Sequence, residues 1–292
     1  MAALRELRRA LGTVVSHPVV LLLAVVLAIL RPPPVLRLYG AVYVVLAGLT
    51  FFLTPAVLAP LLTRADDALR GREPTGLVAA VRDRYVDLLV GNLGFAGLQI
   101  GVNLAVGLFA ALIVVVLLVV GVGLGGLASG GTGGTAASDA GVDSALPTAL
   151  AGATLVGYLV VLLLGLVGFG VNLLLDVALV FYKPAIVVGD RDVGDAFRES
   201  YRLVRENLAV AGGFYVVRLA VGLLFGGVAL VAALAVFSVG ELGSLTETAS
   251  GGLTVLLGIV VVAYLGRSLT YAVTLPYTVN VYQFLRYRDE QA

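Results

Sequence analysis

Long apolar stretches dominate this sequence and limit the folds that it can adopt. A helix needs about 20 mostly apolar residues to cross the hydrocarbon layer of a bilayer. The mean hydropathy of the 292 residues is +1.06, which is typical of a protein embedded in a membrane. Hydropathy places six predicted spans, at about residues 14–30, 38–62, 92–127, 148–182, 208–239 and 252–283. We therefore expect an all-α, polytopic transmembrane helical bundle that forms a single integral membrane domain over residues 1–292.

The residues between these stretches argue against an enzyme. Every connection is short, so no soluble catalytic domain of ordinary size fits between the spans. The chain has no cysteine and a single histidine, His17, which excludes thiolate metal sites, two-histidine metal sites and relays that need a second histidine. The acidic run "GDRDVGDAF" at 189–197 lacks further aspartates at a spacing that suits a metal, and a turn followed by an acidic first helical turn accounts for it. We expect no catalytic activity, no metal and no cofactor.

The distribution of basic residues predicts the orientation in the membrane. Fifteen Arg and Lys residues lie in the N-terminal segment, the second and fourth connections and the C-terminal tail, whereas the odd-numbered connections hold only Arg31 and Arg37. The positive-inside rule therefore places both termini in the cytoplasm of a multi-pass protein of the cell (plasma) membrane. A cleaved signal peptide is the rival interpretation of Arg5 to Arg9 before the first apolar stretch. No small-residue cleavage site follows that stretch, so we interpret it as a span.

An internal repeat organises the chain. Ala80-Val81-Arg82-Asp83 aligns with Ala196-Phe197-Arg198-Glu199, "LAVGL" recurs at 104–108 and 219–223 in nearly the same register, and a third copy opens at Ala3-Leu4-Arg5-Glu6. Each copy carries a proline near the inner end of its second span, namely Pro55, Pro184 and Pro276, where we expect helix breaks. The sequence thus predicts three parallel two-span repeats, at about residues 1–63, 75–185 and 192–285, each preceded by a cytoplasmic interfacial amphipathic helix.

Residues 192–208 contain the most charged segment of the chain. Apolar residues recur at helical spacing along it and include Tyr201, while Asp195, Arg198, Glu199, Arg202, Arg205 and Glu206 fill the other side. This pattern predicts an amphipathic helix in the cytoplasmic interface, with opposite charges of Asp195 and Arg198, and of Arg202 and Glu206, close enough to pair. The helix either only leads the chain into the next span or offers a surface, formed by Arg198, Arg202 and Arg205, to a partner.

The segment from Phe181 to Leu208, "FYKPAIVVGDRDVGDAFRESYRLVRENL", resembles a segment shared by uncharacterised prokaryotic six-span membrane proteins of unknown function, including haloarchaeal families. These proteins are related to the membrane domain of glycerophosphodiester phosphodiesterases. The resemblance implies an integral membrane protein. It does not imply hydrolysis, because the hydrolase of those relatives is a separate soluble domain that this chain lacks.

Polar residues within the predicted spans form a second set of candidates. Asp176 lies eight residues before Pro184 and Arg267 nine before Pro276, so both lie about 12–14 Å from equivalent prolines. Arg218 lies at a similar depth and aligns in the repeat with Asn103, one turn after Gln99. Asp176 is expected to pair with Arg218 or Arg267, since a lone charge in the membrane is costly. The remaining arginine then either binds an anionic ligand or snorkels to the interface.

Small residues predict where helices pack closely. Glycines in "GLQIG" at 97–101 and "GLLFG" at 222–226 give two spans a face that allows close packing within the bundle. The function we expect is that of a membrane scaffold or accessory protein, because the most patterned feature is the cytoplasmic helix. The alternative is a permease-like or lipid-handling protein that binds an anionic substrate or headgroup near Arg218 and Arg267. Expected partners are the lipid bilayer and either an anionic lipid or a membrane or cytoplasmic protein, with no nucleic acid.

Overall fold

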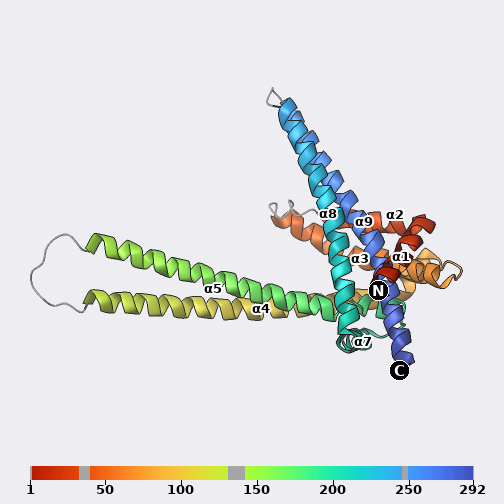
Figure 1. The fold of residues 1–292 in the computed structure, drawn as a ribbon, viewed down its shortest axis with the longest axis horizontal. Helices are drawn as coiled ribbons and strands as arrows, with labels where there is room; N and C mark the ends of the chain where they lie inside the picture. Colours follow the sequence, from red (N-terminus) through yellow and green to blue (C-terminus); the bar gives the residue numbers. More distant parts are fainter. Residues whose placement is uncertain (1, 33–39, 131–141, 245–248, 292) are drawn as a thin grey trace, which may run out of the picture. The chain divides into compact units, whose positions relative to one another are not determined.

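The fold was analysed in a computed structural model that describes residues 2–32, 40–130, 142–244 and 249–291 (Figure 1). These residues form helices and contain no strand, as the sequence predicts. In chain order the helices are α1 (Ala2–Ser16), α2 (Pro18–Leu30), α3 (Gly40–Arg70), α4 (Leu77–Gly130), α5 (Val142–Ala178), α6 (Tyr182–Val187), α7 (Val193–Glu206), α8 (Leu208–Ser244) and α9 (Ala249–Glu290).

Five of these helices are long and apolar enough to cross a membrane, and a bent pair raises the number to six within the described ranges. The five lie within α3, α4, α5 to α6, α8 and α9. The first predicted span, 14–30, is not one straight helix, because α1 and α2 meet at His17 at an angle of 95°. Pro18 occupies the first turn of α2, where its missing N–H leaves no bond broken. At 13 residues α2 is about 20 Å long, shorter than the hydrocarbon layer.

The chain divides into two compact units. One unit comprises Met1–Leu93 and Val177–Ala292, and the other comprises Gly94–Asp176. In the first unit, α9 packs against α1, α2, α3 and α8, and α6 packs against α7. Helix α9 is therefore the element around which the first unit is assembled.

Aromatic side chains fill the centre of the first unit. Phe181, just before α6, lies 5.4 Å from the ring of Phe214 in α8, and Phe214 stacks on Tyr277 in α9 at 5.0 Å between ring centroids. These three residues and Tyr282 are fully or almost fully buried. Such ring contacts add to the hydrophobic gain of burial. The cluster joins α8 and α9 to the segment that leads into α6 and α7.

Close packing of α8 on α9 depends on a glycine that the sequence motifs did not single out. A Cβ on Gly266 would lie 2.9 Å from the carbonyl oxygen of Phe225 and 2.7 Å from the Cβ of Ala229. By contrast, no described atom lies within 4 Å of a Cβ placed on Gly222 or Gly226. The close contact of α8 with α9 is therefore made at Gly266 and not at the glycines of "GLLFG".

The second unit contains parts of α4 and α5, which lie side by side (yellow and green in Figure 1). A Cβ on Gly168 in α5 would lie 3.2 Å from a methyl group of Val106 in α4, so the two backbones approach closely there. One turn later in α5 and about one turn earlier in α4, the Nδ2 of Asn172 donates a 2.8 Å hydrogen bond to the Oδ1 of Asn103. Polar and small residues thus form the contact within this hairpin.

Two details of the predicted repeat differ in the structure. The charged segment that opens the second repeat, before the third predicted span, is not a separate helix, because α4 runs without interruption from Leu77. Helices α3 and α9 also continue through Pro55 and Pro276, so these prolines do not break a helix. A proline removes one backbone donor, whereas ending a helix inside a bilayer would leave several groups unpaired. Near Pro184 the chain does leave the helix, between α5 and α6.

Candidate functional site

Helix α7 packs against the rest of the first unit through a face that includes a charged side chain. Its buried residues are Ala196, Glu199, Ser200, Leu203 and Val204. The prediction that Glu199 belongs to the outer, polar side is wrong, because this residue is only 8% exposed. Tyr201, predicted on the apolar side, is 55% exposed. The inner face is thus rotated relative to the predicted apolar stripe, which brings a carboxylate into the interior.

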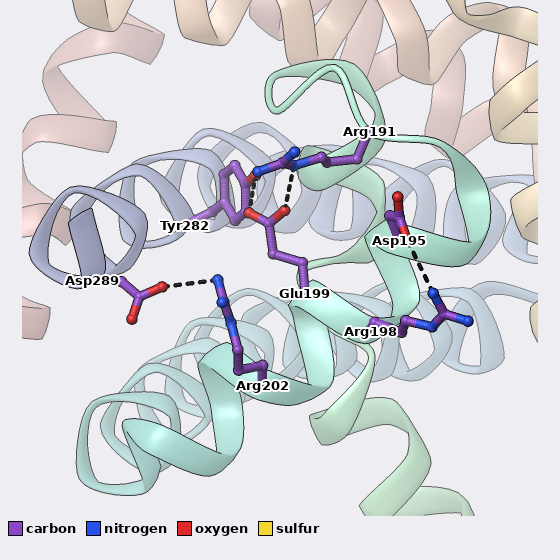
Figure 2. Close-up of polar contacts among 7 residues, drawn as sticks. All are labelled: Arg191, Asp195, Arg198, Glu199, Arg202, Tyr282 and Asp289. Carbon is purple, nitrogen blue, oxygen red and sulfur yellow. Dashed lines mark hydrogen bonds and ion pairs between the residues drawn. The ribbon is translucent and has the colours of Figure 1, made fainter.

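Figure 2 shows the contacts that compensate the buried charge of Glu199. The hydroxyl of Tyr282 in α9 donates a 2.8 Å hydrogen bond to Oε1, and the Nε of Arg191 donates a 2.8 Å hydrogen bond to Oε2. A buried carboxylate costs free energy unless it is both paired and hydrogen-bonded. Here each oxygen has its own partner, and the arginine comes from the turn immediately before α7.

Ser200, the next residue in α7, hydrogen-bonds backbone groups at the interruption between α5 and α6. Its hydroxyl accepts a 3.1 Å hydrogen bond from the backbone N–H of Phe181 and donates a 2.9 Å hydrogen bond to the carbonyl of Ala178. These backbone groups lack helical partners because the helix stops there. The chain can therefore break before Pro184 while its polar groups stay paired.

The outer face of α7 presents three arginines together with the exposed acidic residues Asp195 and Glu206. Arg198 pairs with Asp195 at 3.3 Å, as the spacing predicts. Arg202 does not pair with Glu206. Its Nη2 lies 2.8 Å from a carboxylate oxygen of Asp289, near the end of α9 (Figure 2). Arg205 is exposed. Arg198, Tyr201, Arg202 and Arg205, here named the α7 outer face, are thus presented by a helix that is anchored to α9 from both sides.

A cavity of about 640 Å³ lies next to the contact between Tyr282 and Glu199. Its walls come from α1, the end of α3, the turn after α6 and the last turns of α9. Tyr282 belongs both to the wall and to the Glu199 contact. The charged wall residues are Arg9, Arg70, Arg286 and Glu6. The cavity is therefore lined by more positive than negative charge. One of the residues that line it, Tyr282, also holds α7 through Glu199.

A buried aspartate in α3 supports one wall of the cavity. Asp66 accepts hydrogen bonds from the Nε of Arg70 at 2.9 Å and from the Nη2 of Arg72 at 2.6 Å. The side-chain amide of Gln283 in α9 also donates to this carboxylate. Three donors from α3, the segment after it and α9 thus converge on one carboxylate, which fixes the position of Arg70 at the edge of the cavity.

The polar residues predicted inside the membrane are distributed over both units. In the second unit, the Nε2 of Gln99 lies 3.4 Å from a carboxylate oxygen of Asp176, while Asn103 bonds Asn172. In the first unit, the Nη1 of Arg267 donates a 3.2 Å hydrogen bond to the carbonyl of Arg31, and its guanidinium lies over the ring of Tyr264. The polar residues of the second unit are therefore brought together in pairs. The proposed pairing of Asp176 with an arginine of the other unit stays a prediction.

Arg218 is the last of the polar residues that the sequence places within the predicted spans. It is exposed on α8, and its side chain makes no hydrogen bond or ion pair with the described residues. An arginine on an apolar helix is costly unless it reaches the interface or finds an anion. Its environment is consistent with both alternatives that the sequence leaves open.

Two of the three aspartates of the "GDRDVGDAF" segment take part in ion pairs. Asp190 lies 2.6 Å from the Nη1 of Arg84 in α4, and Asp195 pairs with Arg198. Asp190 adopts a positive φ of 54°, which an aspartate in a tight turn tolerates. The ring of His17 contacts the hydroxyl of Ser16 at 2.8 Å. Among the residues that the structure describes, no three His, Asp or Glu side chains are grouped so that they could hold a metal ion.

The sequence was compared with the models of known protein families. Residues 1–285 match the family described as a domain of unknown function, DUF7847. The chain belongs to the DUF7847 family. No curated protein and no solved structure matches it. The DUF7847 match agrees with the expectation of a family of unknown function. It shows no link to glycerophosphodiester phosphodiesterases or to haloarchaea, so that resemblance stays a prediction.

The sequence did not reveal the polar contacts that hold this DUF7847 protein together at α7. The helical pattern places Glu199 on the outer side and gives no signal for Ser200 or Tyr282. One signal was available: Glu6 and Glu199 occupy the same position in the aligned repeat, each directly after an arginine. Both are buried, with exposed fractions of 3% and 8%. A glutamate at one position in two repeat copies is a reasonable candidate for an interior contact.

Proposed function

We propose that this DUF7847 protein is an integral membrane scaffold or accessory protein without catalytic activity of its own. It lies in the plasma membrane with both termini in the cytoplasm, and it is built of three parallel two-span units, the first and third of which begin with the amphipathic helices α1 and α7. The observation that supports this function is the α7 outer face, a basic surface on a helix that is fixed from behind by Glu199 and Ser200. Its partner is an acidic segment of a membrane or cytoplasmic protein.

The anchoring of α7 favours a docking role over a purely connecting one. A helix that only leads the chain into the next span does not need a buried charge network on one side. Arg198 is 86% exposed along its side chain and Arg202 55%, so both guanidinium groups are accessible. Because α7 is already ordered, a partner would lose little free energy in ordering the surface to which it binds. Opposite charge on the partner would direct the encounter and set specificity.

Purification from native membranes tests this function. The wild type should recover a defined protein, and a variant with Arg198→Ala, Arg202→Ala and Arg205→Ala should lose it. Raising the salt concentration should weaken recovery of the same protein, since exposed charges are screened. A matched control is Arg5→Ala with Arg8→Ala, which removes exposed cations from α1 and should leave recovery unchanged. Recovery of the same proteins with wild type and α7 variant would contradict the scaffold function.

A second candidate function, a permease-like or lipid-handling protein, is favoured by the state of two arginines. Arg218 has no ion-pair partner within the described residues, and Arg267 is bonded to a neutral carbonyl. Each could hold an anionic substrate or headgroup. Mass spectrometry of gently purified wild type and Arg218→Ala tests this. A stoichiometric ligand that the variant loses would support it, and a ligand absent from both would leave the scaffold as the better account.

A further inference from the structure

We propose that the cavity between α1, α3 and α9 binds a phosphate ester through Arg9, Arg70 and Arg286. This inference does not depend on the scaffold function, because none of these residues belongs to the α7 outer face. The cavity volume of about 640 Å³ falls in the range of about 300–1,000 Å³ that is typical of small-molecule sites. It is much larger than a single inorganic phosphate. The site therefore suits a phosphate that carries an organic group.

Two cations of the cavity, Arg70 and Arg9, retain donors for a ligand. Arg70 contacts Asp66 only through Nε, which leaves its two terminal nitrogens, and Arg9 contacts Glu6 through Nη1 at 3.4 Å. A guanidinium has five N–H donors in a planar fork, an arrangement that matches the oxygens of a phosphate. Arginines from three different helices thus line one cavity, where a phosphate has enough oxygens to accept hydrogen bonds from more than one of them.

The charge balance of the cavity favours an anion. Three guanidinium groups and one carboxylate, that of Glu6, line it. Asp66 lies behind Arg70, but this carboxylate also binds Arg72 at 2.6 Å, so it has a second cation to balance it. Glu199 is likewise bound to Arg191. The residues that line the cavity therefore carry more positive than negative charge, which a bound dianion would offset.

The position of the cavity leaves two sources for this phosphate ester. The last turns of α9 lie beyond the most apolar part of that helix, so the cavity is at the polar end of a predicted span. A headgroup of an anionic phospholipid could enter from the bilayer interface, and a soluble phosphate ester could enter from the water. Both present the same phosphate oxygens to the arginines.

The test uses the full chain in nanodiscs, with one variant and one matched control. Arg9→Gln removes a cavity cation, while Arg5→Gln removes a neighbouring cation of α1 that also pairs with Glu6, at 3.8 Å, but does not line the cavity. In phosphatidylcholine nanodiscs, calorimetry with glycerol 3-phosphate measures the soluble source. Native mass spectrometry after purification with added phosphatidylglycerol measures the lipid source. Circular dichroism confirms that both variants are folded.

The proposal expects at least one of these probes to bind with a stoichiometry near one. Arg9→Gln should weaken that binding by about tenfold or more, since a hydrogen bond to a charged group is lost, while Arg5→Gln should stay within about twofold of wild type. Selective loss of glycerol 3-phosphate binding would identify a soluble ester, and selective loss of retained phosphatidylglycerol would identify a headgroup. Binding of neither probe by the wild type, or equal binding by the two variants, would overturn the proposal. If Arg9→Gln does not fold, Arg286→Gln replaces it with the same expected results.

Discussion

The hydroxyl of Tyr282 donates a 2.8 Å hydrogen bond to the carboxylate of Glu199, which lies 83 residues earlier in the chain. This bond joins α9 to α7. A related contact joins α9 to α1, where the side-chain amide of Asn280 donates a 3.1 Å hydrogen bond to the carbonyl of Glu6. Glu6 and Glu199 align in the repeat, so the last turns of α9 hold two helices that carry a similar short motif near their start.

Replacing Tyr282 by Phe should destabilise the protein by about 1–3 kcal/mol, because one oxygen of the buried Glu199 carboxylate loses its partner. Chemical unfolding in detergent, followed by circular dichroism, measures the change. Tyr287→Phe is the matched control. Its side chain lies one and a half turns further along α9 and is 64% exposed, so little change is expected. Equal stability of both variants would show that the Glu199 contact contributes nothing.

Replacing Ser200 by Ala should cost about 1–3 kcal/mol, since the N–H of Phe181 and the carbonyl of Ala178 both lose their hydrogen-bond partner. Ser268→Ala is the control. That serine is also buried, but its hydroxyl donates to the carbonyl of Tyr264 within α9, a group that the helix can satisfy without it. Limited proteolysis between α5 and α7 should show faster cleavage in Ser200→Ala only. Similar stability and cleavage of the two variants would contradict the role given to Ser200.

Replacing Gly266 by Ala should destabilise the packing of α8 on α9 by about 1–3 kcal/mol, because the added methyl group meets backbone atoms of Phe225. Gly222→Ala is the comparison within α8. Its methyl group meets no described atom within 4 Å, and alanine has the higher helix propensity. The thermal midpoint in detergent should fall for Gly266→Ala and hold or rise for Gly222→Ala. The reverse order would show that α8 and α9 pack through "GLLFG".

The ion pair of Arg202 with Asp289 should contribute only about 0.2–1 kcal/mol, because both side chains are partly exposed to solvent. A double-mutant cycle with Arg202→Ala and Asp289→Ala isolates this coupling free energy. Raising the salt concentration should reduce it further. A coupling free energy above about 2 kcal/mol would mean that the pair is much better shielded from water than its exposure indicates.

Asp176→Asn tests whether this carboxylate pairs with a membrane arginine. The hydrogen bond from Gln99 can persist in the variant, so a large loss of stability would report a lost cation rather than a lost amide contact. We expect the thermal midpoint in detergent to fall more for Asp176→Asn than for Gln99→Leu, since an interhelical polar contact in a membrane contributes only about 0.6 kcal/mol on average. An unchanged midpoint in Asp176→Asn would remove the support for the ion pair.

The sequence predicted the features that depend on neighbouring residues. Helical structure and the number of apolar helices follow from runs of residues, since a bilayer requires each span to satisfy its own backbone. The pairing of Asp195 with Arg198 also follows from spacing alone. The sequence does not predict the bend at His17 or the continuity of α4 from Leu77. In both places a short amphipathic pattern leads into a span, so the pattern alone does not show whether the helix bends or continues.

The charged contacts of α7 could be found only in three dimensions. Adjacent residues on a helix are about 100° apart, so the sequence allowed Glu199 to face either the water or the protein. Its burial depends on Tyr282, which α9 brings to it from 83 residues away. The cavity has the same origin, since Arg9, Arg70 and Arg286 come from three helices. Local composition therefore specified a membrane protein built of helices, while the site formed only where distant helices meet, because its charges are stabilised by partners that no local pattern identifies.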